Sequence, residues 1–402
     1  MRCVAKQQQA ERDEYVRKNR REVDRFAGLT DPLDIICELQ TWRKPDPLAV
    51  YKPFTYTSAG LYAGLTLEQR NRLVAVAIQE RKAGNKDLSE TIAKSLATLT
   101  DHDISELAIA CLDEGEFRPS VLFRGANAVV RDRIIRFLVA WNKERHGTLA
   151  VNHALCALAW IGDAEVQSRF AAWERDPLVW RSDLHVGPKI YAHTGGWEPS
   201  VHGRRELVFN SCWAIIPLQS PEPADRSVVP FAKRDSACPW CSRPLVNMLS
   251  IDGTDPRFAF LGWMQPRLEI LTCDACTCFT DHLFSRIAAD GTAAWHPANI
   301  RPKAMSGDHG DWGASPWQGV SIRIQVRGGL EAVEPDVGVS ASQIGGHPCW
   351  VQDTAYPACP DCFRTMRFVA QLDNENFKHH EGSYYAFLCT DCRVTATCYQ
   401  QT

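Results

Sequence analysis

The sequence lacks the features that mark membrane-spanning and exported proteins. No apolar run approaches the roughly 20 residues that a membrane-spanning helix needs. Residues 1–26 are charged throughout and contain no apolar segment of the secretory-signal type. A strong net charge is also missing, because 45 basic and 48 acidic residues give −3 at pH 7, which provides no global attraction to nucleic acid. These absences predict a cytoplasmic protein that binds neither membrane nor nucleic acid.

The common catalytic signatures are missing as well. The chain contains no GxSxG, no HExxH, no Walker A sequence and no GxGxxG that begins a helix. His347 and Cys349 have the residue types of a base and a nucleophile, but their place in a turn beside Trp350 favours a structural role. The sequence therefore predicts that the protein is not an enzyme, and an enzyme with a site between two domains is the last alternative.

The N-terminal part has the periodicity of helices. Residues 1–27 predict a charged leading helix, with charges of both signs at i, i+4 spacing. Within residues 28–177, apolar residues recur at steps of three and four, and Thr66 and Gly84 suit the start and the end of one helix. Residues 149–177 resemble one unit of a HEAT-type repeat. We therefore expect a HEAT-like helical domain over 28–177, with an irregular helical bundle as the alternative.

The character of the sequence changes after residue 177, where glycine, proline and aromatic residues become more frequent. Residues 178–230 predict a connecting segment, with one or two buried strands within 205–218. Residues 231–402 are rich in strand and turn patterns, and the alternation of apolar and polar residues at 319–328 is typical of a half-buried strand. The fold class predicted for the whole chain is α+β.

An internal duplication lies in this C-terminal region. The stretch "CPWCSRPLVNMLSID" (238–252) matches "CPDCFRTMRFVAQLD" (359–373), and each ends in an Asp eleven residues after its second cysteine (241 to 252, and 362 to 373). Further along, an apolar strand leads into a second cysteine pair in each copy, "RLEILTCDAC" and "YYAFLCTDC". We infer two repeats, at about 231–290 and 340–402, and expect Asp252 and Asp373 to cap turns at the strand ends.

The eight cysteines of these pairs have the spacing of metal ligands. Zn²⁺ prefers four soft ligands in a tetrahedron, and two residues between cysteines let both sulfur atoms reach one ion. The sequence predicts two structural Cys₄ zinc sites in a duplicated zinc-ribbon-containing β domain, closed either within or across the repeats. Iron–sulfur ligation, a redox dithiol and disulfides are the weaker alternatives. The predicted ligands are Cys238, Cys241, Cys273, Cys276, Cys359, Cys362, Cys389 and Cys392.

The second repeat resembles a known family. "SQIGGHPCWVQ" (342–352) followed by "ACPDCFRTMRFVAQLD" (358–373) is similar to the YwqG-like domain family and to the related programmed cell death protein 2 family. The resemblance covers about 340–400 well and 238–290 weakly, and it does not extend to the helical half. It implies a β-rich binding domain without an established catalytic centre. Bacterial members lie beside polymorphic toxins and are suspected immunity proteins, whereas eukaryotic relatives are associated with chaperoning a ribosomal protein.

These observations lead to one expected function and one alternative. We expect a bacterial immunity protein, or antitoxin, whose partner is a cognate polymorphic or secreted toxin. The alternative is a zinc-stabilised chaperone or adaptor, whose partner is a ribosomal or other client protein.

Overall fold

The computed structural model describes residues 2–54, 56–200, 203–218, 223–303, 305, 315–333, 340–377 and 380–401. The chain divides into two compact units, Met1–Ile134 and Ile135–Thr402. The predicted boundary at residue 177 therefore falls inside the second unit, which combines helices with all the larger sheets. Among the described residues, no helix has both the length and the apolar composition needed to cross a membrane.

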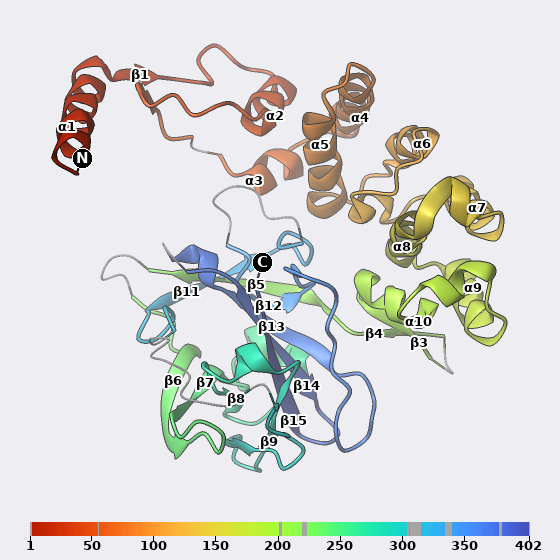
Figure 1. Ribbon diagram of the computed structural model, residues 1–402, viewed down its shortest axis with the longest axis vertical. Helices are drawn as coiled ribbons and strands as arrows, with labels where there is room; N and C mark the ends of the chain where they lie inside the picture. Colours follow the sequence, from red (N-terminus) through yellow and green to blue (C-terminus); the bar gives the residue numbers. More distant parts are fainter. Residues whose placement is uncertain are drawn as a thin grey trace. The chain divides into compact units, whose positions relative to one another are not determined.

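The first unit is mainly helical (Figure 1). Its leading helix is shorter than the predicted segment 1–27, because it ends at Asn19 and a two-stranded parallel sheet of β1 and β2 follows. The elements of this unit are α1 (Arg2–Asn19), β1 (Arg21–Val23), α2 (Pro32–Gln40), β2 (Ala49–Tyr51), α3 (Ser58–Ala63), α4 (Leu67–Lys82), α5 (Lys86–Leu99), α6 (Ser105–Asp113), η1 (Ser120–Phe123) and the first half of α7 (Ala128–Val139).

Local sequence signals set the ends of these helices. Thr66 and Gln69 form a reciprocal capping box at the start of α4, in which each side chain accepts a hydrogen bond from the other residue's backbone N–H. Gly84 follows the helix with a φ of 90°, a conformation that glycine adopts without a steric penalty. Helices α2, α3 and α4 all contact α5, which buries Leu88, Ile92 and other apolar residues.

The second unit begins with helices that continue into a β-rich region. The predicted HEAT-like unit is a helix–turn–helix in the structure: α8 (Lys143–Ile161) ends at Gly162, whose φ is 55°, and α9 (Ala164–Arg175) begins after the N-cap Asp163. The Asp163 side chain accepts a hydrogen bond from the N–H of Val166 at 2.9 Å. Then follow η2 (Val179–Asp183), α10 (Pro188–Tyr191), η3 (Ala192–Gly195) and the hairpin of β3 (Trp197–Ser200) and β4 (Gly203–Glu206).

Two further sheets carry the cysteine pairs, and both are antiparallel. The larger has eight strands in the order β10-β9-β15-β14-β13-β12-β5-β11, and the smaller has three in the order β6-β7-β8. The strands are β5 (Phe209–Pro217), β6 (Val228–Ala237), β7 (Pro244–Ile251), β8 (Leu268–Thr272), β9 (Leu283–Ile287), β10 (Ala293–Trp295), β11 (Ile322–Arg327), β12 (Gln343–Gly346), β13 (Arg367–Asp373), β14 (Ser383–Cys389) and β15 (Val394–Gln400). The short helices η4 (Pro256–Leu261), η5 (Thr277–Phe279) and η6 (Asn374–Asn376) lie between them.

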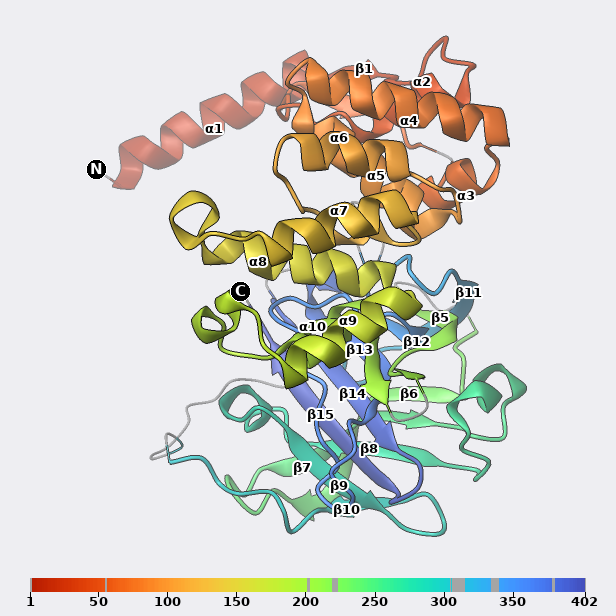
Figure 2. The same cartoon turned by 90° about the vertical axis from the view of Figure 1, so that its right-hand side faces the viewer.

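Apolar side chains cover both faces of the large sheet. Figure 2 shows β13, β14 and β15 side by side, and β14 is buried along its whole length. Alternate residues of β14 enter different clusters: Tyr384 and Leu388 pack with residues of the three-stranded sheet, whereas Tyr385 and Phe387 pack on the opposite face. The predicted α+β class is confirmed, with a helical part followed by a β-rich part that contains two four-cysteine clusters.

Candidate metal centre

The first cluster gathers the four cysteines of the first repeat. Cys238 and Cys241 lie in the turn between β6 and β7, and Cys273 and Cys276 lie in the turn that follows β8. The Sγ atoms of Cys238 and Cys276 are 3.7 Å apart, and those of Cys241 and Cys273 are 3.6 Å apart. Three of the four residues are buried, and Cys241 is partly exposed.

The second cluster repeats this arrangement. Cys359 and Cys362 precede β13, Cys389 is the last residue of β14, and Cys392 lies in the turn between β14 and β15. The Sγ atoms of Cys362 and Cys389 are 3.8 Å apart, and the ligand atoms of each cluster all lie within 4.8 Å of one another. The structure thus brings together the eight cysteines that the sequence predicts, and it answers the question of pairing: each cluster closes within its own repeat.

The sulfur–sulfur distances fit a metal ion and not a disulfide. Four sulfur atoms about 2.3 Å from a central ion form a tetrahedron with edges of about 3.8 Å. The observed 3.6–3.8 Å matches that edge, whereas a disulfide bond measures about 2.05 Å. No disulfide joins the fifteen cysteines whose side chains the structure describes. The chemistry of the donor sets therefore fits two metal sites.

The first turn of each cluster has the same backbone geometry. In the first repeat, the N–H of Cys238 donates to the carbonyl of Arg243, and the N–H of Ser242 donates to that of Cys238. In the second, Cys359 and Phe363 donate to Arg364 and Cys359 in the same pattern. The residue after the second cysteine is left-handed in both, with φ of 62° and 59°. This match supports the duplication inferred from the sequence.

Each cluster also has an arginine two residues after its second cysteine, a feature whose role the sequence did not reveal. Arg364 forms an ion pair with Asp391, the residue before Cys392. Burial acts to raise the pKa of Cys362, but hydrogen bonds from the backbone and side chain of Arg364 outweigh it and lower this pKa to about 6. In the first repeat, Arg243 has the matching position; burial raises the pKa of Asp274, and the charge of Arg243 offsets only part of that rise. The repeated Cys-x-x-Cys-x-Arg pattern was the available signal.

Replacing Arg364 by glutamine should weaken metal binding at the second site alone. The substitution removes the positive charge beside four sulfur ligands and the donor to Cys362, and comparable second-layer changes cost about 10- to 100-fold in metal affinity. Competition with a chromogenic chelator measures this, with the exposed Arg226→Gln as the matched control. Equal release of both metals from the variant and from the control would contradict the role given to Arg364.

The matched aspartates cap turns, as the sequence predicts. Asp252, at the end of β7, accepts hydrogen bonds from the N–H and the hydroxyl of Thr254 at 2.9 and 2.6 Å. Asp373, at the end of β13, accepts from the N–H of Glu375 at 3.0 Å. In both, the side chain bonds to the backbone two residues ahead and turns the chain out of the strand.

The two repeats meet through their last strands. Strand β9 pairs antiparallel with β15, with Ser285 opposite Thr395. The buried hydroxyls of these two residues are 2.5 Å apart, and the hydroxyl of Thr272 lies 2.8 Å from that of Thr397. Since each pair joins one repeat to the other, the two cysteine clusters belong to one continuous structure.

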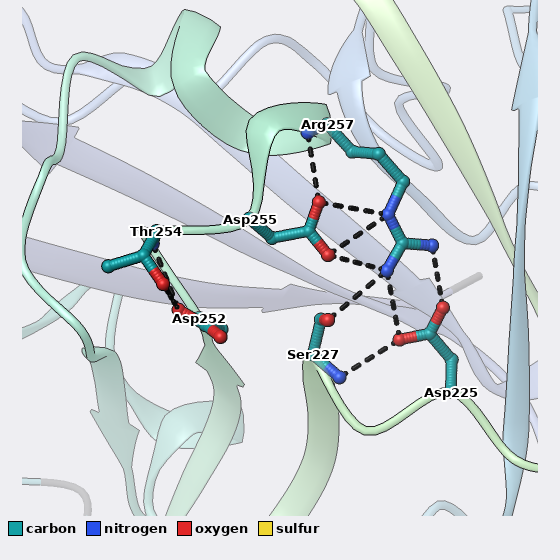
Figure 3. Close-up of polar contacts among 6 residues, drawn as sticks. All are labelled: Asp225, Ser227, Asp252, Thr254, Asp255 and Arg257. Carbon is teal, nitrogen blue, oxygen red and sulfur yellow. Dashed lines mark hydrogen bonds and ion pairs between the residues drawn. The ribbon is translucent and has the colours of Figure 1, made fainter.

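A second group of charges lies at the start of β6 (Figure 3). The Arg257 guanidinium donates to both oxygens of Asp255, to both oxygens of Asp225, and to the hydroxyl of Ser227 at 3.2 Å. The hydrogen bonds from Arg257 lower the pKa of Asp255, and they outweigh the effect of burial on Asp225. Arg257 pairs with two carboxylates at once, so the group holds η4 against the segment that leads into β6.

Glu198 is a buried acid on β3 whose partners also satisfy it. It accepts hydrogen bonds from Arg205 at 2.7 Å and from the hydroxyl of Thr365 at 2.6 Å, and His193 Nε2 lies 3.8 Å away. Burial acts to raise its pKa, but the nearby His193 and the hydrogen bonds from Thr365 and Arg205 lower it to about 2. Glu198 therefore ties the β3–β4 hairpin to the second repeat.

The "GGHPCW" stretch has a packing role. Trp350 stacks on Tyr385 with ring centroids 4.7 Å apart, as expected of an anchor. Gly345 and Gly346 lie in β12, where the register with β5 shifts. His347 is buried and stacks on Trp160 at 4.7 Å, so the nucleophile–base interpretation gains no geometric support.

His347 should make stability depend on pH. Burial lowers its pKa to about 4, although both ring nitrogens face carbonyl oxygens at 3.0 and 3.1 Å. The unfolded chain, with a histidine pKa near 6.5, binds more protons between these values, so stability is full above about pH 6.5 and falls towards about pH 4. The loss from this residue approaches about 3 kcal/mol.

Denaturant titrations from pH 7.5 to pH 4, on the protein and on His347→Gln, test this. The difference in unfolding free energy between the two proteins should shrink or reverse as the pH falls, because glutamine does not titrate. Comparing the two proteins at each pH cancels the loss of metal in acid, which affects both. A difference that stays constant over the whole range would show that His347 is not the titrating group.

Comparisons with known proteins give one relative to report. A curated protein of Salmonella typhimurium (strain LT2), described as uncharacterized protein YpfL, is 34% identical over 409 residues, which cover 100% of this chain and 93% of that protein. No family model matches the sequence, and no solved structure matches the chain.

Proposed function

The chain belongs to the family of the Salmonella YpfL protein, and on that premise we propose that it is a non-enzymatic, protein-binding protein with two structural zinc sites. One observation carries the proposal: each cluster supplies four protein sulfur atoms to one position. Four protein ligands fill a tetrahedron and leave no coordination position for a substrate. The sites then stabilise the fold, and binding is a property of the surface.

Zinc is the metal we propose. Eight thiolates in two mononuclear Cys₄ sites suit Zn²⁺, whereas an iron–sulfur cluster also needs inorganic sulfide. Elemental analysis of purified protein should give two zinc ions per chain and no visible absorption. A brown protein that contains iron and acid-labile sulfide would refute this assignment. A reducing location, the cytoplasm, is part of the proposal, because no disulfide joins the described cysteines.

The proposed partner is a toxin, which makes the protein a bacterial immunity protein. The first support is the resemblance of the second repeat to YwqG-like domains. The second is that each described cysteine cluster offers four protein ligands, which leave no free coordination position on a metal ion. Co-expression with the product of an adjacent toxin gene should relieve toxicity, and the two proteins should purify as a complex. If no neighbouring gene product is toxic or binds, the immunity role fails. If depletion of this protein makes a client protein insoluble, that result would then favour the chaperone or adaptor role.

Exposed aromatic residues of the first unit are the first candidates for the surface that binds the partner protein. Trp42 is 76% exposed and Tyr56 is 62% exposed, and these residue types are enriched where proteins bind one another. In the complex assay above, Trp42→Ala should weaken binding, and Val179→Ala, which changes an equally exposed aliphatic residue, should not. Equal affinity for both variants would place the interface elsewhere.

A further inference from the structure

The second unit contains a cavity that is separate from both cysteine clusters. Its volume is about 500 Å³, and it is lined by residues of α8, of the segment 183–194 and of the loop at 353–354. This volume falls within the range of about 300–1,000 Å³ typical of small-ligand pockets. None of the eight clustered cysteines lines it.

The charged residues that line the cavity are acidic. Asp183 and Asp353 belong to the lining, which contains no lysine or arginine. Asp183 already forms an ion pair with Lys143 at 2.5 Å. Asp353 has no ion pair within the described ranges of the chain, and it is exposed, so its carboxylate marks the point where the cavity meets solvent. One uncompensated negative charge therefore faces the entrance.

The loop that carries Asp353 is held in place before any ligand binds. The Gln400 side chain donates to the carbonyl of Asp353 at 2.8 Å and accepts from the N–H of Gln352 at 3.0 Å. On the opposite wall, the Tyr191 hydroxyl donates to Asn152. Because these hydrogen bonds hold the loop backbone and the Tyr191 side chain in place, little free energy is lost in ordering them when a ligand binds.

The rest of the lining combines apolar and polar side chains. Leu149, Leu184, Val186 and Ile190 form its apolar part, beside the thiol of Cys156, and the polar part includes His153 and His185. A ligand that suits the cavity thus has a short apolar body and a cationic end.

We propose that this cavity binds an alkylammonium or alkylguanidinium group, with the cation at Asp353 and the carbon chain against the wall formed by Leu149 and Ile190. Two sources supply this chemistry: a free small amine, or a lysine or arginine side chain of a bound protein. The inference stands apart from the proposed function, because small cations alone test it.

The electrostatics of the wall agree with this assignment. Burial, with a smaller contribution from the negative charge of Asp353, raises the pKa of Cys156 to about 11 and that of Tyr191 to about 12, and the charge of Arg181 acts in the opposite direction on Tyr191. The Asp353 carboxylate therefore acts on side chains inside the cavity and not only on solvent.

Calorimetric titration of the full chain with small cations tests the proposal. The titration is done at pH 8, where a free imidazole is neutral and an alkylamine still carries its positive charge. The probes are n-butylammonium, n-butylguanidinium, a lysine blocked at both ends, and neutral 1-butanol. Asp353→Asn should weaken the binding of the cations about tenfold, the size expected for one charge-assisted hydrogen bond. The exposed Asp235→Asn is the matched control and should bind as the unaltered protein does.

The results distinguish a free small amine from a protein side chain as the ligand, and they also show whether the proposal fails. Binding of the amines without the blocked lysine points to a free small amine, and binding of the blocked lysine as well points to a protein side chain. Equal binding of 1-butanol, equal affinity of Asp353→Asn, or no binding of any cation at millimolar concentration would each overturn the proposal. Circular dichroism of both variants confirms that they fold.

Discussion

Replacing Cys359 by serine should reduce the bound metal from two ions per chain to one and destabilise the second repeat. Cys359 is fully buried among Met366, Phe368 and Phe387, so the variant leaves three sulfur ligands and an unsatisfied hydroxyl in an apolar site. Structural zinc contributes about 10 kcal/mol or more in zinc-finger peptides. The loss here should be smaller, because the sheet core also holds β13 and β14, but it should exceed the effect of replacing a cysteine outside the two clusters.

The matched control is Cys349→Ser, which alters a half-buried cysteine outside the cluster. Metal content by elemental analysis and the melting temperature should change in Cys359→Ser and stay close to the unaltered values in the control. Hydrogen exchange should show faster exchange around 359–366 and 389–393, and little change at the first cluster. Two bound metal ions in a folded Cys359→Ser protein would contradict the assignment of the second site.

The cysteine pairs could be predicted because their signal is local. Spacing of two residues and a turn-forming proline are visible in four letters, and the eleven-residue match to Asp252 and Asp373 fixes the repeat. The capping roles of Thr66 and Asp163 are local in the same sense, since each side chain bonds to a backbone N–H three residues ahead. Interactions of short range in sequence need no knowledge of the remaining chain.

The arrangement of the strands could not be predicted in this way. The repeats are alike in sequence, but β7 and β8 lie in a three-stranded sheet, whereas β13, β14 and β15 lie in the large sheet. Strand β9 leaves its own repeat to pair with β15, and β5 pairs with β11 and β12. Which strands pair depends on how much apolar surface distant segments bury against each other. The alternation of apolar and polar residues within one strand does not contain that information.

The same reason explains the polar contacts that the sequence did not reveal. Arg364 and Asp391 are 27 residues apart, and Glu198 meets Thr365 across 167 residues. A lone arginine or glutamate in a sequence is most often exposed to solvent, so only the folded chain shows which of them is placed beside a metal ligand or inside the core.

Gly345→Ala should destabilise the second unit strongly, because its backbone conformation and its surroundings both exclude a side chain. Its φ is 74°, and a Cβ atom would lie 2.1 Å from the carbonyl oxygen of Ser211 and 2.8 Å from the ring of Phe260. Ser211 belongs to β5, so relief of this clash needs β5 and β12 to separate. That separation would break ladder hydrogen bonds that join β5 and β11 to the rest of the eight-stranded sheet.

Gly319→Ala is a control that isolates the clash from the backbone strain. Gly319 has the same φ of 74°, but an added Cβ atom would meet nothing within 4 Å. Both variants incur the left-handed cost of about 1–2 kcal/mol, and Gly345→Ala should lose about 3 kcal/mol more from overpacking. Urea unfolding of the two variants measures this difference. Equal losses would mean that β12 moves away from β5 at little cost, and the bulge at Gly345 would then not determine the register of the sheet.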